Sequence, residues 1–283
     1  MFQLISDSFI QMAFWASLLA SLASGPVGSF VVVKRIVFIA GSISHSILGG
    51  VGLCLWLQRT QGVSRLDPMT GAFGAAIASA LLIGWIHLHY RQREDAVIAA
   101  IWSTGMSIGV VFFSLTPGNS GELSNFLFGN ILWIRSTDLI LLGSLDAALL
   151  SIVALNFRRF LAICFDEDQS LLQGLSVQKL YLVLLCIVAV TIVLLIQVIG
   201  TILVLALLTI PATLAALFTR SLPTMMLLAS TLSLLFCTLG LGASYALNWP
   251  PGATIALLAA LFYLLALLLQ KKKLNPSSLL TKA

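Results

Sequence analysis

Charged residues are scarce in this sequence: Asp, Glu, Lys and Arg make up 9% of its 283 residues. A typical soluble domain carries about 25% charged residues, so a chain with so few could not cover a water-facing surface. Hydrophobic residues make up 59% of the chain, and the mean hydropathy is +1.07. The composition therefore predicts a protein embedded in a lipid bilayer, and the net charge of +5 gives no reason to expect a nucleic-acid partner.

Catalytic and cofactor motifs are also missing. The chain has no HExxH, GxSxG, GxxxxGK[ST] or strand-linked GxGxxG pattern. Its four cysteines, Cys54, Cys164, Cys186 and Cys237, fall in or beside apolar runs with no CxxC spacing, which predicts small buried side chains and not disulfides or metal ligands. We therefore expect no catalytic site and no permanently bound cofactor.

Long apolar runs dominate what is present. A membrane-spanning helix needs about 20 apolar residues, and nine such segments can be drawn in the sequence: 9–33, 36–58, 68–90, 95–116, 136–157, 178–199, 200–219, 222–246 and 252–270. No polar stretch is long enough for a separate soluble domain. The sequence predicts an all-α, polytopic transmembrane bundle in which residues 1–283 form a single domain.

Basic residues set the expected orientation of the spans. They gather at alternate connections, at Lys34, Arg35, Arg91, Arg93, Arg158, Arg159, Lys179, Arg220 and Lys271 to Lys273. Short loops rich in Lys and Arg stay in the cytoplasm. The pattern predicts a multi-pass protein of a bacterial inner membrane, with the N-terminus outside and the C-terminus in the cytoplasm. The weakest boundary is Gly200, where two spans meet with almost no loop.

Two stretches do not look like simple spans. Residues 120–133 are apolar but too short to cross, which favours a re-entrant or interfacial piece packed on protein. The longest cytoplasmic loop, about 160–179, has acidic residues at Asp166 and Glu167, then Leu171 and finally Gly174. This order is typical of a short helix with its N-terminal charges and its glycine C-cap. Such a helix either docks on a soluble partner or lies on the membrane surface.

His45 is the most informative polar residue. At 1.5 Å per residue it lies about 14 Å from Ile36, near the middle of a hydrocarbon core of about 30 Å. A buried ionisable group at this depth is a functional-site hypothesis, and imidazole is a common ligand of transition metals. Small residues at Gly41, Gly49 and Gly52 share its helix face, so the face lines a narrow passage or packs closely on a neighbour. The alternative is a histidine hydrogen-bonded to a backbone carbonyl.

Two further polar or helix-breaking positions lie inside spans. Pro211 frees the carbonyl of Leu207, and Thr209 and Thr213 could help to satisfy the broken turn. The position is predicted to act as a hinge, with ordinary packing as the alternative. Asp146 lies within the fifth span and has no evident partner; the bundle interior is one place for its side chain, and the sequence assigns it no role.

Three blocks in register resemble the ABC-3 permeases, the membrane subunits of bacterial zinc and manganese importers. They are VVVKRIVFIAGSISHSILGGVGL (31–53), REDAVIAAIWSTGMSIGVVFF (93–113), and FDEDQSLLQGLSV with QVIGTILVLALLTIPATLAALF (165–177 and 197–218). The first is similar to the family's RR-x-ALIGDALSHAVLPGVAL. The resemblance assigns the family's metal-binding His to His45 and its Ser to Ser44, whereas the family's Asp falls on Gly41, so half of that site is absent.

The resemblance also implies the partners. It implies a type II-like importer permease that works as a dimer, with itself or a paralogue, on two cytoplasmic ATP-binding subunits. A metal-binding protein outside the membrane would deliver zinc, manganese or iron. The loop at 160–179, with Asp166, Glu167, Leu171 and Gly174, would couple to the ATP-binding subunits. The competing hypothesis is an ion-coupled secondary transporter of a small solute, which would function without an ATPase.

Overall fold

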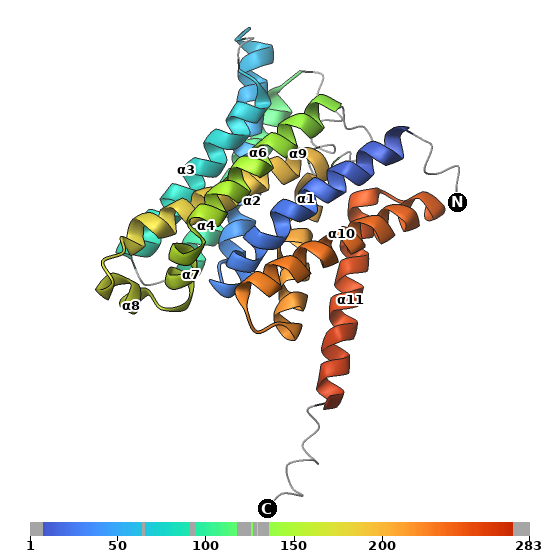
Figure 1. Cartoon of the computed structure of the whole chain (residues 1–283). Coiled ribbons are helices and arrows are strands. Elements are labelled where there is room, and N and C mark those ends of the chain that lie inside the picture. Colours follow the sequence, from blue (N-terminus) through green and yellow to red (C-terminus); the bar gives the residue numbers. More distant parts are fainter. Residues whose placement is uncertain are drawn as a thin grey trace, which may run out of the picture.

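The structure, a computed structural model, describes residues 8–63, 66–90, 94–117, 126, 129 and 136–273, and within them every regular element is a helix. The long helices are α1 (Ser8–Val33), α2 (Val37–Thr60), α3 (Pro68–His89), α4 (Glu94–Leu115), α6 (Ser136–Leu155), α9 (Val177–Phe218), α10 (Leu222–Leu247) and α11 (Pro251–Lys273). Two short helices, α7 (Phe157–Phe165) and α8 (Glu167–Leu172), lie at one end of the bundle (Figure 1). The predicted all-α fold is confirmed.

The nine expected spans match the described helices closely. Nine helical segments are long and apolar enough to cross a membrane in the part of the chain that the structure describes. Two of them, Val177–Gln197 and Ile199–Phe218, belong to α9. Helix α9 is interrupted at Gly200, whose φ of 77° and ψ of 166° are not helical. The boundary seen in the sequence at Gly200 is therefore a real break.

Glycine explains the break at Gly200. A φ of this sign disfavours residues with a Cβ, and the backbone here is also crowded. Gly129, itself at φ 68°, lies so close that a Cβ on it would stand 2.5 Å from the backbone nitrogen of Gly200. Most of the expected re-entrant piece, 120–133, lies outside the described residues, but at Gly129 this piece packs against the break in α9.

Helix α2 packs closely on two neighbours, because glycine removes the side chains between them. A Cβ on Gly50 would lie 2.1 Å from the carbonyl oxygen of Gly71 in α3. A Cβ on Gly105 of α4 would lie 2.5 Å from the Cα of Ser46. Helices in lipid gain no hydrophobic free energy by associating, so close backbone contact of this kind is a main source of their attraction.

Helix α9 joins these helices to the rest of the bundle. It contacts α2 and α3 as well as α1, α6, α10 and α11. Its residues 184 to 196 are mostly buried and apolar. The core of the protein thus surrounds α9, and α4 lies at the margin with most of its surface exposed.

Two glycines of α3 provide a test of this packing. A Cβ at Gly71 would meet the backbone of Gly50 at 2.3 Å, whereas a Cβ at Gly74 meets nothing within 4 Å. We expect Gly71→Ala to lower the stability of the purified protein by about 1–3 kcal/mol through overpacking. Gly74→Ala should leave it unchanged or raise it slightly, because alanine favours helix. Thermal midpoints in detergent measure both, and equal midpoints would contradict the close α2–α3 contact.

Candidate functional site

His45 lies on α2, half-buried, with its ring stacked on the indole of Trp102 from α4. The ring centroids are 4.5 Å apart and the planes differ by 13°. Among the described residues, the imidazole nitrogens make no hydrogen bond to the protein. The expected alternative, a histidine bonded to a backbone carbonyl, therefore has no support in this arrangement. The ring is fixed by stacking, which leaves its nitrogens for another partner.

The small residues around His45 are covered by α4. A Cβ on Gly49 would lie 3.0 Å from the carbonyl oxygen of Gly105, and one on Gly52 would lie 2.9 Å from that of Gly109. Ser42 donates to the carbonyl of Ile98 at 2.9 Å. Of the two uses expected for this face, the structure shows close helix packing, with His45 at the margin of the contact.

Trp102 fills the space beside Gly41. A Cβ on Gly41 would lie 3.3 Å from Cζ3 of Trp102, so an acid at this position would require the indole to move. The nearby Ser44 is fully buried and its hydroxyl donates to the carbonyl of Gly41 at 2.8 Å. Neither Gly41 nor Ser44 therefore offers a free side-chain ligand here. Trp102 was not singled out from the sequence, because its proximity to His45 depends on the register of α4 against α2.

No complete metal site exists within one copy of the described residues: they contain no group of three or more His, Cys, Asp or Glu side chains that could hold a metal ion. His87 and His89 are engaged locally, with the ring of His87 4.7 Å from that of Tyr181 and Nδ1 of His89 2.9 Å from the carbonyl of Trp85. The four cysteines are free thiols. Cys54 and Cys237 are buried, whereas Cys164 and Cys186 are half-buried.

Two hollows flank α2. A cavity of about 350 Å³ is lined by α2, α3 and α9, with Gln197 as a polar residue in its wall. A more open groove of about 680 Å³ runs between α3 and α4 and is lined mainly by Gly and Ala, with Ser46, Ser79 and Thr104. His45 lines neither hollow.

The expected coupling loop is built from two short helices. Helix α7 buries Phe160 and Ile163 against the bundle. Asp166 is the N-cap of α8, and its carboxylate accepts the backbone N–H of Gln169 at 2.9 Å. Gly174, at φ 77°, ends α8: its N–H donates to the carbonyl of Leu171, and the next N–H donates to that of Ser170. These paired bonds form a Schellman C-cap. The predicted short helix with acidic start and glycine end is present.

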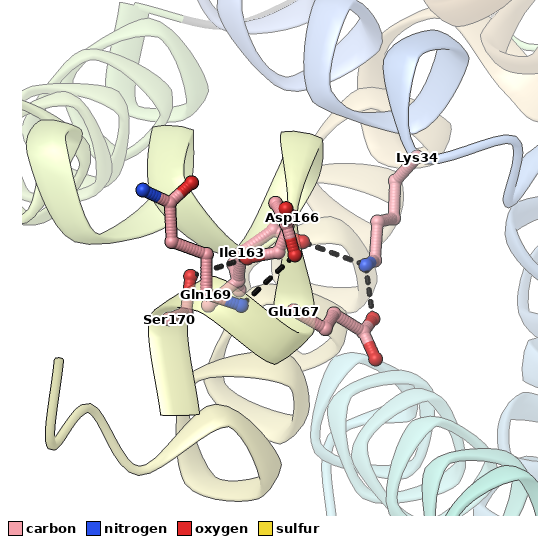
Figure 2. A network of polar contacts seen from close by, with 6 residues as sticks. All are labelled: Lys34, Ile163, Asp166, Glu167, Gln169 and Ser170. Atoms are coloured by element: carbon pink, nitrogen blue, oxygen red, sulfur yellow. Dashed lines mark hydrogen bonds and ion pairs between the residues drawn. The ribbon is translucent and has the colours of Figure 1, made fainter. Parts of the chain in front are cut away.

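Helix α8 presents its leucines to solvent. Leu171 is 55% and Leu172 89% exposed. Glu167 is tied back to Lys34 (Figure 2). These leucines give α8 an exposed apolar end outside the candidate spans. Of the four residues expected to couple, Leu171 is the one free to contact a partner, whereas Asp166 and Gly174 shape the helix.

Pro211 lies within the uninterrupted second half of α9. The non-helical residue of this helix is Gly200, eleven positions earlier in the chain. The hydroxyl of Thr209 donates to the carbonyl of Leu205, and that of Thr213 donates to the carbonyl of Thr209. Neither hydroxyl therefore bonds to the carbonyl of Leu207, which Pro211 leaves without its helical donor. The role of Pro211 as a hinge stays a prediction, and Gly200 is the position in α9 where the backbone leaves helical geometry.

Asp146 faces the bundle interior, on the buried face of α6 with Leu142 and Leu149. The residue is 2% exposed, and neither carboxylate oxygen has a hydrogen-bond partner among the described residues. An unpaired carboxylate removed from water is costly in a membrane helix.

The buried carboxylate of Asp146 leads to a prediction about the thermal stability of the protein. Asparagine keeps the shape of the side chain and removes its charge. Asp146→Asn should therefore leave the thermal midpoint in detergent unchanged or raise it by a few degrees, which corresponds to a gain of about 1 kcal/mol or more in the free energy of unfolding. Ser144→Asn, on an exposed part of the same helix, serves as the control. A clear fall in the midpoint for Asp146→Asn alone would mean that the carboxylate has an essential partner.

The chain is similar to known proteins over nearly its whole length. The profile of the ABC 3 transport family matches residues 6–270. A Chlamydia pneumoniae protein named "Probable metal transport system membrane protein" is 49% identical over 97% of this chain and 94% of its own length. The manganese transport system membrane protein MntC of Listeria monocytogenes is 32% identical, covering 95% of this chain and 94% of the relative.

A solved structure is similar over nearly the whole chain. PsaBC from Streptococcus pneumoniae, determined in complex with Fab, superimposes with a TM-score of 0.81 at 29% identity. The match covers 93% of this chain and 92% of that one. The bundle described above therefore has the fold of that chain.

Proposed function

Because the chain belongs to the ABC 3 transport family, we propose that it is the membrane-spanning permease of an ATP-binding-cassette importer for a divalent transition metal. The observation that carries the proposal is the α7–α8 segment, an ordered pair of short helices that projects exposed leucines beyond the candidate spans. Named relatives support a metal as cargo, since one transports manganese. An ion-coupled secondary transporter would not need such a segment.

In this proposal ATP is hydrolysed on separate cytoplasmic subunits that bind α8 through Leu171 and Leu172. The α7–α8 segment and the turn between α1 and α2 face the cytoplasm of a bacterial cell, as the basic residues Lys34, Arg35 and Arg158 favour. An extracytoplasmic metal-binding protein delivers the ion to the opposite face. The permease itself has no catalytic residue in this scheme.

The ion would pass His45, which offers an imidazole nitrogen near the middle of the membrane. One copy supplies a single side-chain ligand at this depth, so a second permease is needed to bring another. The second permease would pack on the outward face of α4. Ser103 and Ser107 are exposed there at successive turns, and hydroxyls are better placed against protein or water than against lipid. A weak site suits a transporter, because a bound ion must also leave.

Labelling of α8 tests both orientation and docking. In a variant without the four native cysteines, Leu172→Cys should react with an impermeant maleimide in inside-out vesicles but not in intact cells. Added ATP-binding subunits should protect it, because they cover α8. Gln61→Cys, just after the far end of α2 and exposed, is the matched control, and it should react in intact cells without protection. Labelling of Leu172→Cys from outside would overturn the orientation, and equal labelling with and without the subunits would overturn docking.

His45→Phe tests the metal ligand. Phenylalanine keeps the stacking on Trp102, worth about 0.5–1.5 kcal/mol, but removes both nitrogens. Uptake of radioactive manganese or zinc by the assembled complex should fall at least about tenfold, as expected for the loss of a ligand, with an unchanged thermal midpoint. Trp102→Phe, which also keeps an aromatic pair, should retain most uptake. Normal uptake by His45→Phe would exclude metal ligation at this position.

A further inference from the structure

Lys34, at the end of α1, reaches across to the junction of α7 and α8. Its Nζ donates to the backbone carbonyl of Ile163 at 2.8 Å and forms an ion pair with Glu167 (Figure 2). The lysine side chain is 12% exposed, whereas that of Glu167 is 46% exposed. Three parts of the chain that are far apart in sequence, the α1–α2 turn, the end of α7 and the start of α8, thus meet at one ammonium group.

The two bonds of Lys34 are favourable for different reasons: the carbonyl of Ile163 is at a helix C-terminus, and the carboxylate of Glu167 carries the opposite charge. Ile163 is in the last turn of α7, where carbonyls lack helical partners and the helix dipole attracts positive charge. Glu167 is the first residue of α8. Burial raises the pKa of the neighbouring Cys164 thiol to about 11, so that thiol stays neutral near pH 7 and does not compete for the ammonium group. The lysine therefore bonds to both short helices at their junction.

Lys34 also belongs to the short, hydrogen-bonded turn between α1 and α2. The N–H of Ile36 donates to the carbonyl of Val31 at 3.0 Å and that of Arg35 to Val32 at 3.1 Å. This is a Schellman motif, with Arg35 at φ 59° where glycine is usual. Ile36 is already the N-cap of α2. Two residues therefore separate Lys34 from the helix that carries His45.

A buried aromatic contact supports the same junction. Phe30, one turn before Lys34, lies with its ring centroid 5.7 Å from that of Phe160 in α7, and both side chains are fully buried. Helix α7 is thereby packed on the end of α1. The exposed helix α8 has no comparable apolar anchor on its own residues, since Ser170 is its buried side chain. Helix α8 also contacts α7 and α9, and Lys34 adds a direct link from α8 to the turn before α2.

We propose that Lys34 is the positioning residue that transmits movement of the α7–α8 segment to α2 and so to His45. A force on α8 would pass through Glu167 to Lys34, and through the short turn to the first residue of α2. The inference rests on the proposed function, in which ATP-binding subunits move α8. In this inference Lys34 determines how much metal is taken up per ATP hydrolysed, and it binds neither the ATP-binding subunits nor the metal.

Three variants of the complete transporter, co-expressed with its ATP-binding subunits, test this role. Lys34→Met keeps the apolar stem and removes both bonds, and Lys34→Arg keeps both donors. Arg35→Met removes an equal charge from the same turn at an exposed residue. The measurements are recovery of the ATP-binding subunits, ATP hydrolysis, and uptake of radioactive manganese or zinc per ATP hydrolysed.

We expect Lys34→Met to retain subunit recovery and hydrolysis while uptake per ATP falls at least about fivefold, the effect of losing one charge-assisted contact. Lys34→Arg should restore coupling, and Arg35→Met should resemble the unmodified protein. Equal coupling in Lys34→Met and Arg35→Met would overturn the proposal, as would loss of subunit recovery in Lys34→Met. If Lys34→Met does not accumulate, Glu167→Gln is measured instead, and unchanged coupling there would overturn the proposal.

A fourth variant separates this inference from the proposed function. Leu172→Asp should abolish recovery of the ATP-binding subunits, because it places a charge on the exposed docking surface while leaving the bonds of Lys34 intact. Full recovery with Leu172→Asp would refute docking at α8. Lost recovery with Leu172→Asp, together with normal coupling in Lys34→Met, would leave docking in place and refute the role of Lys34 alone.

Discussion

Direct contact between helix backbones at glycine is the interaction on which this bundle depends. In a bilayer, apolar side chains gain nothing by leaving lipid for protein, so helices associate through shape. Here Gly50 and Gly71 bring α2 against α3, and Gly105 and Gly109 bring α4 against the other side of α2. Helix α2 is therefore held on both sides with little freedom to rotate, and the orientation of His45 toward Trp102 follows from that restraint.

A second level of organisation lies outside the spans. Helix α7 is amphipathic and buries its apolar face against α1, whereas α8 is polar at its start and exposes leucine at its end. The first is fixed by packing and the second by charge. Under the proposed function, this division suits a segment that stays attached to the membrane helices while it offers a surface to the ATP-binding subunits.

The sequence predicted the helices well because the signal for each is local. Hydrophobic runs located the spans to within a few residues, and the acidic start and glycine end of α8 were visible as cap chemistry. What could not be predicted depends on contacts distant in the chain: the ion pair of Lys34 joins residues separated by 133 positions, and the stacking of His45 on Trp102 requires the register of two helices. The break in α9 shows the limit of reading residue types alone. The boundary at Gly200 was visible in the sequence as two spans with almost no loop between them, whereas the crowding of Gly129 against Gly200 was not, and Pro211 lies in uninterrupted helix.

The three-residue connection between α1 and α2 also has a consequence for how the chain is made. Two spans joined so tightly enter the bilayer as a helical hairpin, since neither can cross without drawing the other after it. In the orientation proposed above, the charges of Lys34 and Arg35 would keep the hairpin's turn on the cytoplasmic side. On the proposed orientation, Lys34 has two roles. During biosynthesis its charge fixes the direction of the first two spans. It pairs with Glu167 only after α7 and α8 have emerged from the ribosome.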